Sequence, residues 1–376
     1  MVFGSWAWLA GLLGCAVVTA MSRLTSDALR DPLPSLDRAL HSWERWDTHL
    51  YEQIARSGYR HDPGTAAFFP LYPLSIRAAD AVLPGGTSVA TFAVSTSACW
   101  AALVLLHRLV TPMLGERVAR RTAGYLLAFP TGFFLVAGYN EALFIALSAG
   151  SLACMHRGHW WRAAGLASLA GATRTTGIFL VVAFGYEYLR QREFSLRRIR
   201  ADLLAVTLAP LGLVAYAGYC WRTFGDPLSF QHAQAAWHRS GPTMPWTTIG
   251  WVVHGIARSP SLLDGPAIIN VISLAAAALM VAALGLALVG RWRLGPDQVY
   301  LVLFSGLGSL VPLLYPLHGD YPLVSVWRYA LECLPMFMLF AKWGARNRHV
   351  ERLYLLTSLP AQALMVYTFT GGGFIA

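Results

Sequence analysis

The residues best suited to chemistry lie in a polar and aromatic segment that follows the first apolar stretch of the chain. Its densest part reads Trp43-Glu44-Arg45-Trp46-Asp47-Thr48-His49-Leu50-Tyr51. A loop beside a bilayer needs only to be soluble, so acid, base and indole groups packed this closely indicate a place where a polar substrate meets a lipid. We expect Asp47 to be the centre of any chemistry.

The composition places this loop in a membrane protein. Hydrophobic residues make up 56% of the 376 residues and charged residues only 13%. A chain of this composition cannot fold around one soluble core without exposing much apolar surface. The candidate spans, judged against the ~20 residues that cross a bilayer core, are Ser5 to Met21, Ser88 to Val110, Thr122 to Ala137, Asn140 to Met155, Trp161 to Leu189, Leu203 to Trp221, Pro266 to Val289, Gln298 to Tyr315, Ser325 to Ala341 and Leu353 to Thr370.

The stretch from Trp161 to Leu189 is long enough to fold back as two short spans. We expect the break around Ala172 to Gly177, because Arg174 would be costly at mid-bilayer depth. The count is then about eleven crossings. The expected fold is an all-α polytopic helical bundle that forms a single integral-membrane domain over residues 1–376.

The basic residues predict the orientation, because cytoplasmic loops collect Lys and Arg. Five clusters can lie on one side: Arg117, Arg120 and Arg121; Arg157 and Arg162; Arg190, Arg192, Arg197, Arg198 and Arg200; Arg291 and Arg293; Lys342, Arg346, Arg348 and Arg352. If the amino terminus is cytoplasmic, all five clusters lie on the cytoplasmic side only if the segment from Phe68 to Val82 lies at the membrane surface or enters the membrane and returns. If this segment crosses the membrane, the number of crossings becomes twelve. The net charge of +10 is thus explained by membrane topology and by attraction to anionic lipid headgroups, and it does not indicate nucleic-acid binding.

Two long external loops and one short one remain for function. They are Ser22 to Ala67, Arg222 to Gly265, and Leu317 to Pro322. In the first loop we expect amphipathic interfacial helices, with Trp43, Trp46 and Tyr51 on one face and Asp47 and Leu50 facing elsewhere. No segment is long and polar enough for a separate soluble domain.

Several motifs in order resemble the PIG-V-like mannosyltransferases. The blocks are Trp46-Asp47 with Tyr51, Ile54-Ala55 and Gly58-Tyr59; Phe68-Phe69-Pro70-Leu71-Tyr72-Pro73; Ala137-Gly138-Tyr139-Asn140-Glu141-Ala142-Leu143-Phe144; Arg174-Thr175-Thr176-Gly177; Phe224-Gly225-Asp226-Pro227-Leu228 with Gln234 and Trp237; and Arg328-Tyr329. Several motifs that occur in the same order over nearly the whole chain indicate a family far more specifically than any one motif does.

This resemblance implies a GT-C glycosyltransferase. Such an enzyme would move mannose from a polyprenyl-phosphate-mannose donor to a lipid-linked or protein acceptor, with inversion, on the outer face of the plasma membrane. Arginine outnumbers lysine 28 to 1, which hints at a G+C-rich bacterial genome. A phosphatidylinositol mannoside, a lipoglycan or a secreted protein is then a better acceptor than a GPI precursor. No acidic cluster in the sequence suggests a bound divalent ion, so we predict metal-independent activity without a cofactor.

The resemblance singles out Asp47 as the general base, because an inverting transfer needs one carboxylate to deprotonate the acceptor hydroxyl. Cations that face the departing phosphate would lower the barrier. The candidates for that role are His318, Arg328, Arg174 and His49. The candidates for substrate contact are Trp46, Tyr51, Glu141, Asn140, Gln234 and Trp237.

Each role has a structural alternative. Asp47 could cap an interfacial helix, and Arg174 and Arg328 could tie helices together through Glu141 and Glu332. His49 could be an interfacial anchor. Trp43, Trp46, Trp237 and Trp327 could belong to the aromatic belt, and Asn140 and Glu141 could cap a hairpin.

Two other functional classes remain open. One is a transporter or flippase of lipid-linked saccharides, against which no pair of equivalent broken helices marks an inverted repeat. The other is a non-catalytic scaffold whose aromatic loops bind a partner. Only the enzyme requires anything of Asp47.

Overall fold

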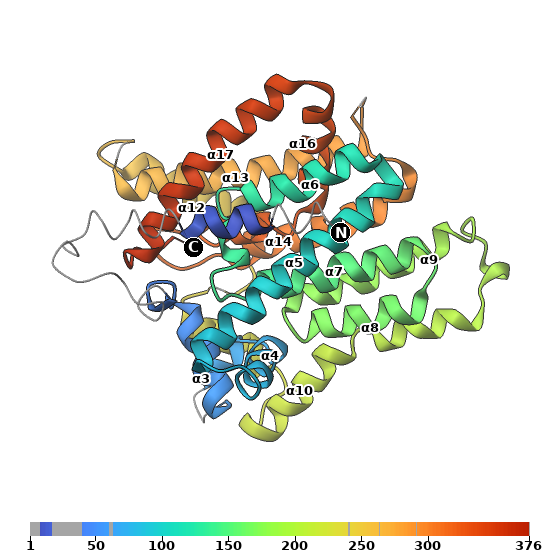
Figure 1. The fold of residues 1–376 in the computed structure, drawn as a ribbon, viewed down its shortest axis with the longest axis horizontal. Coiled ribbons are helices and arrows are strands. Elements are labelled where there is room, and N and C mark those ends of the chain that lie inside the picture. Colours follow the sequence, from blue (N-terminus) through green and yellow to red (C-terminus); the bar gives the residue numbers. More distant parts are fainter. Residues whose placement is uncertain are drawn as a thin grey trace. The chain divides into compact units, whose positions relative to one another are not determined.

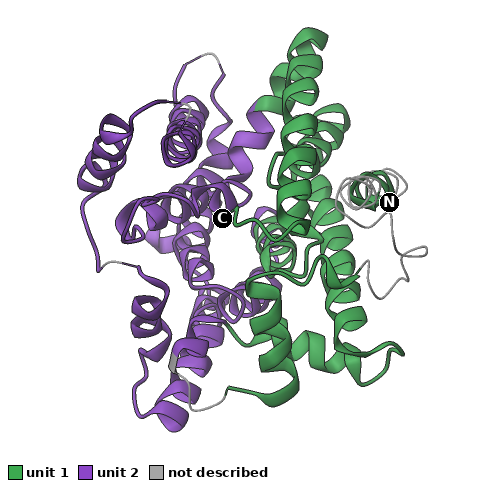
Figure 2. Ribbon diagram, turned by 90° about the vertical axis from the view of Figure 1, so that its left-hand side faces the viewer, with its two compact units in different colours: residues 1–60, 69–153, 340–375 green, residues 61–68, 154–339, 376 purple. Residues whose placement is uncertain are grey.

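The computed structural model describes residues 8–16, 40–59, 63–239, 241–262, 264–290 and 292–375, and most of these residues are helical (Figure 1). Part of the first predicted span, residues 22–39 of the first external loop, and Arg291 lie outside the described residues. The chain divides into two compact units, which Figure 2 colours separately. Unit 1 holds residues 1–60, 69–153 and 340–375, and unit 2 holds residues 61–68, 154–339 and 376. The expectation of a single domain stays a prediction.

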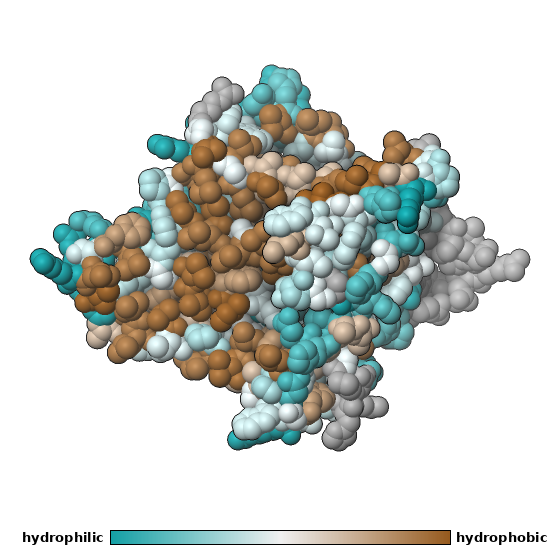
Figure 3. All heavy atoms as spheres, turned by 180° about the vertical axis from the view of Figure 1, so that it is seen from behind, coloured by the Kyte–Doolittle hydropathy of each residue, from teal (hydrophilic) through white to brown (hydrophobic). Residues whose placement is uncertain are grey.

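Among the described residues, four helical segments are long and apolar enough to cross a membrane. They are Gly86–Leu114, Ala201–Phe224, Gly265–Leu288 and Pro296–Leu314. Each coincides with a predicted span. Brown apolar side chains cover much of the face drawn in Figure 3, as expected of a protein surrounded by lipid. The protein is therefore an all-α, multi-pass membrane protein, and the count of about eleven crossings stays a prediction.

Unit 1 is built on the long helix α5 (Gly86–Leu114), which contacts α3, α4 and α6. The helices and 3₁₀ segments with residues in this unit are α3 (Asp47–Ser57), α4 (Leu71–Asp80), α6 (Glu116–Ala128), η3 (Gly132–Leu135), α7 (Glu141–His156), α16 (Leu334–Arg346) and α17 (Arg348–Thr370). α3 buries Thr48, Tyr51, Glu52 and Ala55 along one face. This helical spacing confirms the expected amphipathic helix in the first loop.

Unit 2 contains the rest of the helices. They are η2 (Pro63–Ala67), α8 (Trp160–Gly171), η4 (Thr175–Phe179), α9 (Leu180–Arg190), η5 (Leu196–Arg198), η6 (Ala201–Leu208), α10 (Leu211–Phe224), α11 (Ser229–His232), η7 (Ala233–Trp237), α12 (Pro245–Arg258), α13 (Gly265–Leu288), η8 (Pro296–Gln298), α14 (Val299–Leu314) and α15 (Val326–Ala330). The break expected around Arg174 is confirmed, because α8 ends at Gly171 and α9 begins at Leu180.

Two predicted spans are interrupted. The stretch from Thr122 to Ala137 is not one helix, because α6 ends at Ala128 and Phe129 is extended with ψ 147°. Phe129 precedes Pro130, and a proline disfavours the helical conformation of the residue before it. The side-chain amide of Gln362 on α17 donates to the carbonyls of Leu127 and Phe129, which the helix end leaves without intrahelical partners.

The second interruption lies between α15 and α16. Ser325 to Ala341 was predicted as one span, but α15 ends at Ala330 and α16 begins at Leu334. Pro335 stands in the first turn of α16, where its missing N–H costs least. The chain therefore starts a new helix here instead of continuing the old one.

The segment that decides the predicted topology forms the short helix α4. It has 10 residues, which cover about 15 Å at 1.5 Å per residue, and a bilayer core is ~30 Å thick. α4 alone is too short to cross. This length supports the arrangement in which Phe68 to Val82 does not span the membrane.

Candidate active site

Asp47 is the first residue of α3 and is partly buried. The preceding N-cap residue, Trp46, has a left-handed backbone with φ 53° and makes no side-chain cap hydrogen bond. Asp47 therefore does not occupy the N-cap position that the structural alternative gave it. A carboxylate side chain in the first turn of a helix interacts favourably with the helix dipole, and Asp47 occupies that position.

The backbone around Asp47 is tied to the segment that precedes α7. The Thr48 hydroxyl donates to the Ala137 carbonyl at 3.1 Å, and the Tyr139 hydroxyl donates to the Arg45 carbonyl at 3.3 Å. Arg45 in turn donates through Nη2 to the Thr370 carbonyl at 3.1 Å. The Trp46-Asp47 motif and the Ala137-Gly138-Tyr139 motif, which are far apart in the sequence, thus form one structure.

Gly138 allows this close approach. It has φ +80°, and a Cβ atom there would lie 2.8 Å from Cγ2 of Thr48 and 3.1 Å from Cγ2 of Thr91. Because of this backbone conformation and the lack of space, a larger residue at position 138 would require local rearrangement. The same segment continues into Asn140 and Glu141, which are 5% and 0% exposed, so these two candidates for substrate contact begin α7 beside the loop that carries Asp47.

The expected placement of the aromatic residues on one face is wrong. Trp43 precedes α3 and is buried against Phe133 and Phe369. Trp46 is 45% exposed and meets the ring of Phe374 edge-on. The expectation failed because α3 begins only at Asp47, so Trp43 and Trp46 do not follow its helical spacing.

Tyr51 is a packing residue. It is 3% exposed, and its ring meets that of Tyr72 at 4.8 Å between centroids and 83° between planes. The Tyr72 hydroxyl shares a hydrogen bond of 2.5 Å with Ser95. The Phe-Phe-Pro-Leu-Tyr-Pro motif thus supports the buried side of α3, and this position suits stacking against the protein better than stacking on a sugar.

His49 lies beside two carboxylates. One ligand atom each of Glu44, His49 and Glu52 lies within 4.8 Å of the others. His49 is exposed and the two carboxylates are buried, which is an unfavourable setting for a phosphate group. The fold thus brings together an acidic cluster that was not apparent in the sequence. The predicted metal independence can therefore no longer be argued from the lack of such a cluster, and it stays a prediction.

Glu52 is the perturbed acid of this cluster. Burial and the neighbouring Glu44 carboxylate raise the pKa of Glu52 from 4.5 to about 7, although Arg56 lies 3.4 Å away. The arginine side chain is 55% exposed, so solvent weakens its compensation. Glu52 can therefore keep a proton near neutral pH.

Arg174, in unit 2, has the geometry of its structural alternative. Its Nε lies 3.0 Å from Glu332 Oε1, and the two side chains are 12% and 4% exposed. The guanidinium also lies 5.3 Å from the centre of the Tyr329 ring, while the Thr176 hydroxyl donates to Glu332 Oε2 at 3.1 Å. A buried and paired arginine of this kind joins helices. Arg328, on α15, is half-buried.

The second and third predicted external loops meet in unit 2. The His318 amide donates to the His238 carbonyl at 2.6 Å, and Arg239 forms an isolated bridge with Leu317. The Arg239 guanidinium donates to the Tyr315 carbonyl at 2.9 Å and to the Ser325 hydroxyl at 3.1 Å. These contacts support the prediction that both loops face the same side, and the sequence did not single out Arg239.

Trp237 contacts the end of the first loop. Its indole N–H donates to the Gly64 carbonyl at 3.1 Å, and its ring packs edge-on against Phe68 at 5.4 Å. Tyr216 adds a hydrogen bond of 2.8 Å to the Ala66 carbonyl. Gln234, in the same 3₁₀ segment, is half-buried.

The predicted site residues divide between the two units. Unit 1 holds Trp46, Asp47, His49, Tyr51, Asn140 and Glu141. Unit 2 holds Arg174, Gln234, Trp237, His318 and Arg328. Each unit assembles its own set, with the carboxylates in the first and the cations, apart from His49, in the second.

We predict that Gly138→Ala destabilises the protein by about 2–4 kcal/mol, because it adds a left-handed alanine and an overpacked methyl group. Thermal unfolding in detergent would measure the change. Adding Thr48→Ser removes the nearest clashing methyl and keeps the hydroxyl, so the double variant should recover part of the loss. Gly218→Ala, which has nothing within 4 Å of its added Cβ, is the matched control. Additive effects of the two substitutions would contradict the contact.

We predict a pH-dependent effect of Glu52→Gln. The folded protein holds the Glu52 proton more tightly than the unfolded chain, so wild-type stability falls as the pH rises from 4.5 to about 7. The variant lacks this loss, so its melting temperature relative to wild type should rise between pH 5 and pH 8, on the order of 2 °C. Glu193→Gln, whose carboxylate is 76% exposed, is the control. A difference that does not change with pH would contradict the raised pKa.

Comparison with known proteins gives the family. The model of the mannosyltransferase (PIG-V) family matches residues 19–247. The chain is 29% identical over 209 residues to GPI mannosyltransferase 2 of Schizosaccharomyces pombe, which covers 54% of this chain and 43% of that protein. It is 30% identical over 169 residues to GPI alpha-1,6-mannosyltransferase 2 of Cricetulus griseus, which covers 42% and 34%.

The matches span less than half the length of these two relatives. Among solved structures, the apo oligosaccharyltransferase of Archaeoglobus fulgidus aligns over 98% of this chain and 56% of its own, with 10% identity and a TM-score of 0.47. The match to the family model covers more than half of the chain and includes Asp47 and the segment that holds it. The chain therefore belongs to the mannosyltransferase (PIG-V) family.

Proposed function

We propose that this protein transfers mannose from a polyprenyl-phosphate-mannose donor to a lipid-linked acceptor of the phosphatidylinositol-mannoside or lipoglycan type, or to a protein. The reaction takes place on the outer face of the plasma membrane. The observation that carries the proposal is the position of Asp47, which lies in the matched part of the chain and begins a helix that a second family motif holds in place. The names of the curated relatives, which are GPI mannosyltransferases, support a lipid-linked acceptor.

The chemistry requires one base and a stabilised leaving group. The acceptor oxygen attacks the anomeric carbon of mannose while the bond from that carbon to the phosphate oxygen breaks. Asp47 takes the hydroxyl proton, and the polyprenyl phosphate leaves with the bonding electrons, which inverts the configuration. Negative charge grows on that phosphate in the transition state, so fixed cations beside it lower the barrier.

His318 and Arg328 are the candidates that we retain for the phosphate. His318 belongs to the loop that meets the second external loop, and Arg328 is half-buried on α15. Arg174 is held by Glu332 and His49 lies beside two carboxylates, so neither is well placed to bind an anion. The substrate contacts from unit 1 are then Trp46, Asn140 and Glu141. The proposed reaction uses this base and these cations and includes no metal ion.

The test is donor-dependent transfer in membranes. Wild type, Asp47→Ala and Asp47→Asn would be supplied with polyprenyl-phosphate-mannose and candidate acceptors, and product would be measured with insertion checked by expression level. Removing a general base should lower turnover by two or more orders of magnitude. Glu193→Gln makes the same carboxylate-to-amide change at an exposed position and should leave turnover unchanged.

Two results would overturn the proposal. Near-normal turnover in Asp47→Asn would remove the base assignment. Absence of product from the wild-type protein with every acceptor, while lipid-linked mannose moves across the membrane, would favour the transporter class.

A further inference from the structure

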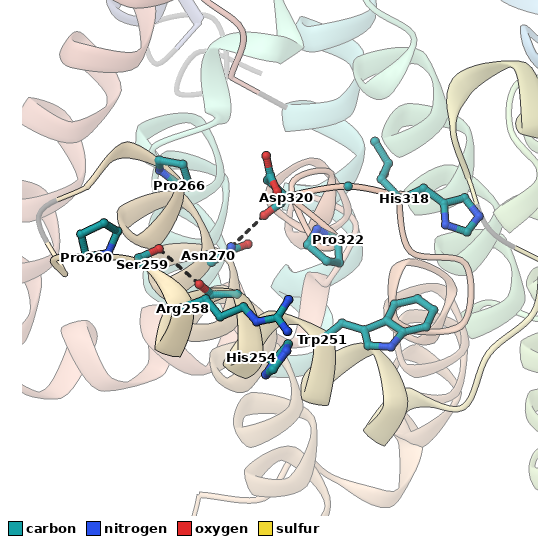
Figure 4. Close-up of a pocket in the computed structure, with 13 residues that line it drawn as sticks. Trp251, His254, Arg258, Ser259, Pro260, Pro266, Asn270, His318, Asp320 and Pro322 are labelled. Carbon is teal, nitrogen blue, oxygen red and sulfur yellow. Dashed lines mark hydrogen bonds between the residues drawn. The ribbon is translucent and has the colours of Figure 1, made fainter.

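A polar cavity opens in unit 2 where α12, α13 and the third predicted external loop come together. Its volume is about 500 Å³. Figure 4 shows the lining side chains, which include His254 and Arg258 from the last turns of α12, Asn270 from α13, and His318 and Asp320 from the loop. Every lining residue lies beyond residue 247, where the match to the family model ends. The match to the family model therefore does not include this cavity, and His318 is the one lining residue that already has a proposed role.

The cavity offers hydrogen-bond donors that the protein does not use. Within the described ranges, no side chain or backbone group pairs with the Arg258 guanidinium or with the His254 and His318 rings. Arg258 and both histidines are exposed, and Figure 4 shows the His254 ring beside the Arg258 guanidinium and the His318 ring well apart from both. An arginine and a histidine side by side form a setting for a phosphate group, which arginine binds through paired N–H groups.

The cavity also offers an acceptor that needs a partner. Asn270 is 2% exposed, and its amide nitrogen donates to the Asp320 carbonyl at 2.8 Å. Its Oδ1 atom is buried and has no hydrogen-bond partner among the described residues. Leaving such an atom unsatisfied costs about 1–3 kcal/mol, so a ligand hydroxyl at this point would be bound favourably. In Figure 4 the Asn270 side chain extends between Asp320 and Arg258.

The Asp320 carboxylate limits which ligands the cavity would bind. Figure 4 places this carboxylate on the side of the loop away from Arg258. It would repel a bare anion that filled the cavity, but it accepts hydrogen bonds from hydroxyl groups. Cationic donors on one side and oxygen acceptors on the other match a phosphate ester that carries hydroxyl groups.

The surroundings indicate that this ligand is a lipid. α13 is a candidate membrane span, and Asn270 is its sixth residue, so the cavity lies at one end of that span. α12 exposes Trp246 by 70% and Trp251 by 42%. Exposed indoles near the end of a span are typical of the membrane–water interface. A headgroup in the cavity would therefore place its apolar chain against these helices.

We propose that this cavity binds the phosphate of a lipid headgroup through Arg258 and His254, and a neighbouring hydroxyl group through Asn270. The inference rests on the proposed function, because it gives that function a binding site for a lipid substrate. A polyprenyl-phosphate-mannose donor and a phosphatidylinositol-type acceptor share this chemistry. The experiment below distinguishes them.

The test measures lipid binding by the full-length protein without turnover. Native mass spectrometry in detergent would give apparent affinities for polyprenyl-phosphate-mannose, plain polyprenyl phosphate, phosphatidylinositol and inorganic phosphate. Arg258→Gln should weaken binding of at least one of the lipids by tenfold or more. Asn270→Ser should weaken binding of the headgroups that carry hydroxyl groups and leave plain polyprenyl phosphate unchanged. Arg222→Gln, an exposed arginine on α10, is the matched control and should bind as wild type does.

Each outcome decides the matter. Loss confined to the polyprenyl lipids supports a donor site, and loss confined to phosphatidylinositol supports an acceptor site. Wild-type affinity of Arg258→Gln for all the lipids, or an effect on inorganic phosphate alone, overturns the proposal. If wild type binds lipid at this cavity yet transfers no mannose, the proposed function fails while the binding site stands.

Discussion

The hydroxyl of Thr48 donates to the carbonyl of Ala137 across a point where only glycine fits, and unit 1 is organised around that contact. It holds the turn before α3 against the segment before α7, so that Asp47 starts a helix whose other side is buried. The ring contact between Tyr51 and Tyr72 then packs the buried side of α3 against α4. The three family motifs in this unit are therefore parts of one scaffold, and Asp47 is the partly buried carboxylate at the start of its helix α3.

Unit 2 uses charge in a different way. Arg174 interrupts what would otherwise be one long apolar helix, and Glu332 compensates its charge at a break between two other helices. A buried arginine with its carboxylate fixes how these interrupted helices meet. The Arg258 side chain, which lines the cavity in this unit, has no such carboxylate partner within the part of the chain that the structure describes. Pairing thus distinguishes Arg174, which serves the fold, from Arg258, which is offered to a ligand.

The membrane setting and the family could be predicted from the sequence, because hydropathy and ordered motifs are local properties, whereas the role of Asp47 stays a prediction. The break at Arg174 followed from the cost of one charge at membrane depth. The interruption at Phe129 was not predicted although Pro130 follows it, because a single proline changes the average hydropathy of an apolar stretch very little. The aromatic face was assigned wrongly because it depended on where α3 begins, and that is decided by contacts with Ala137 and Tyr139. The cavity could not be predicted, since it depends on how α12, α13 and a distant loop pack together.

The central claim is that the Asp47 carboxylate deprotonates the acceptor hydroxyl. It can be tested most directly by an experimental structure of the protein with polyprenyl-phosphate-mannose and an acceptor bound. The account predicts an Asp47 oxygen within about 2.6–3.2 Å of the acceptor hydroxyl, on the face of the sugar opposite the phosphate. A bound donor and acceptor with Asp47 turned away from that hydroxyl, and another carboxylate in its place, would contradict it.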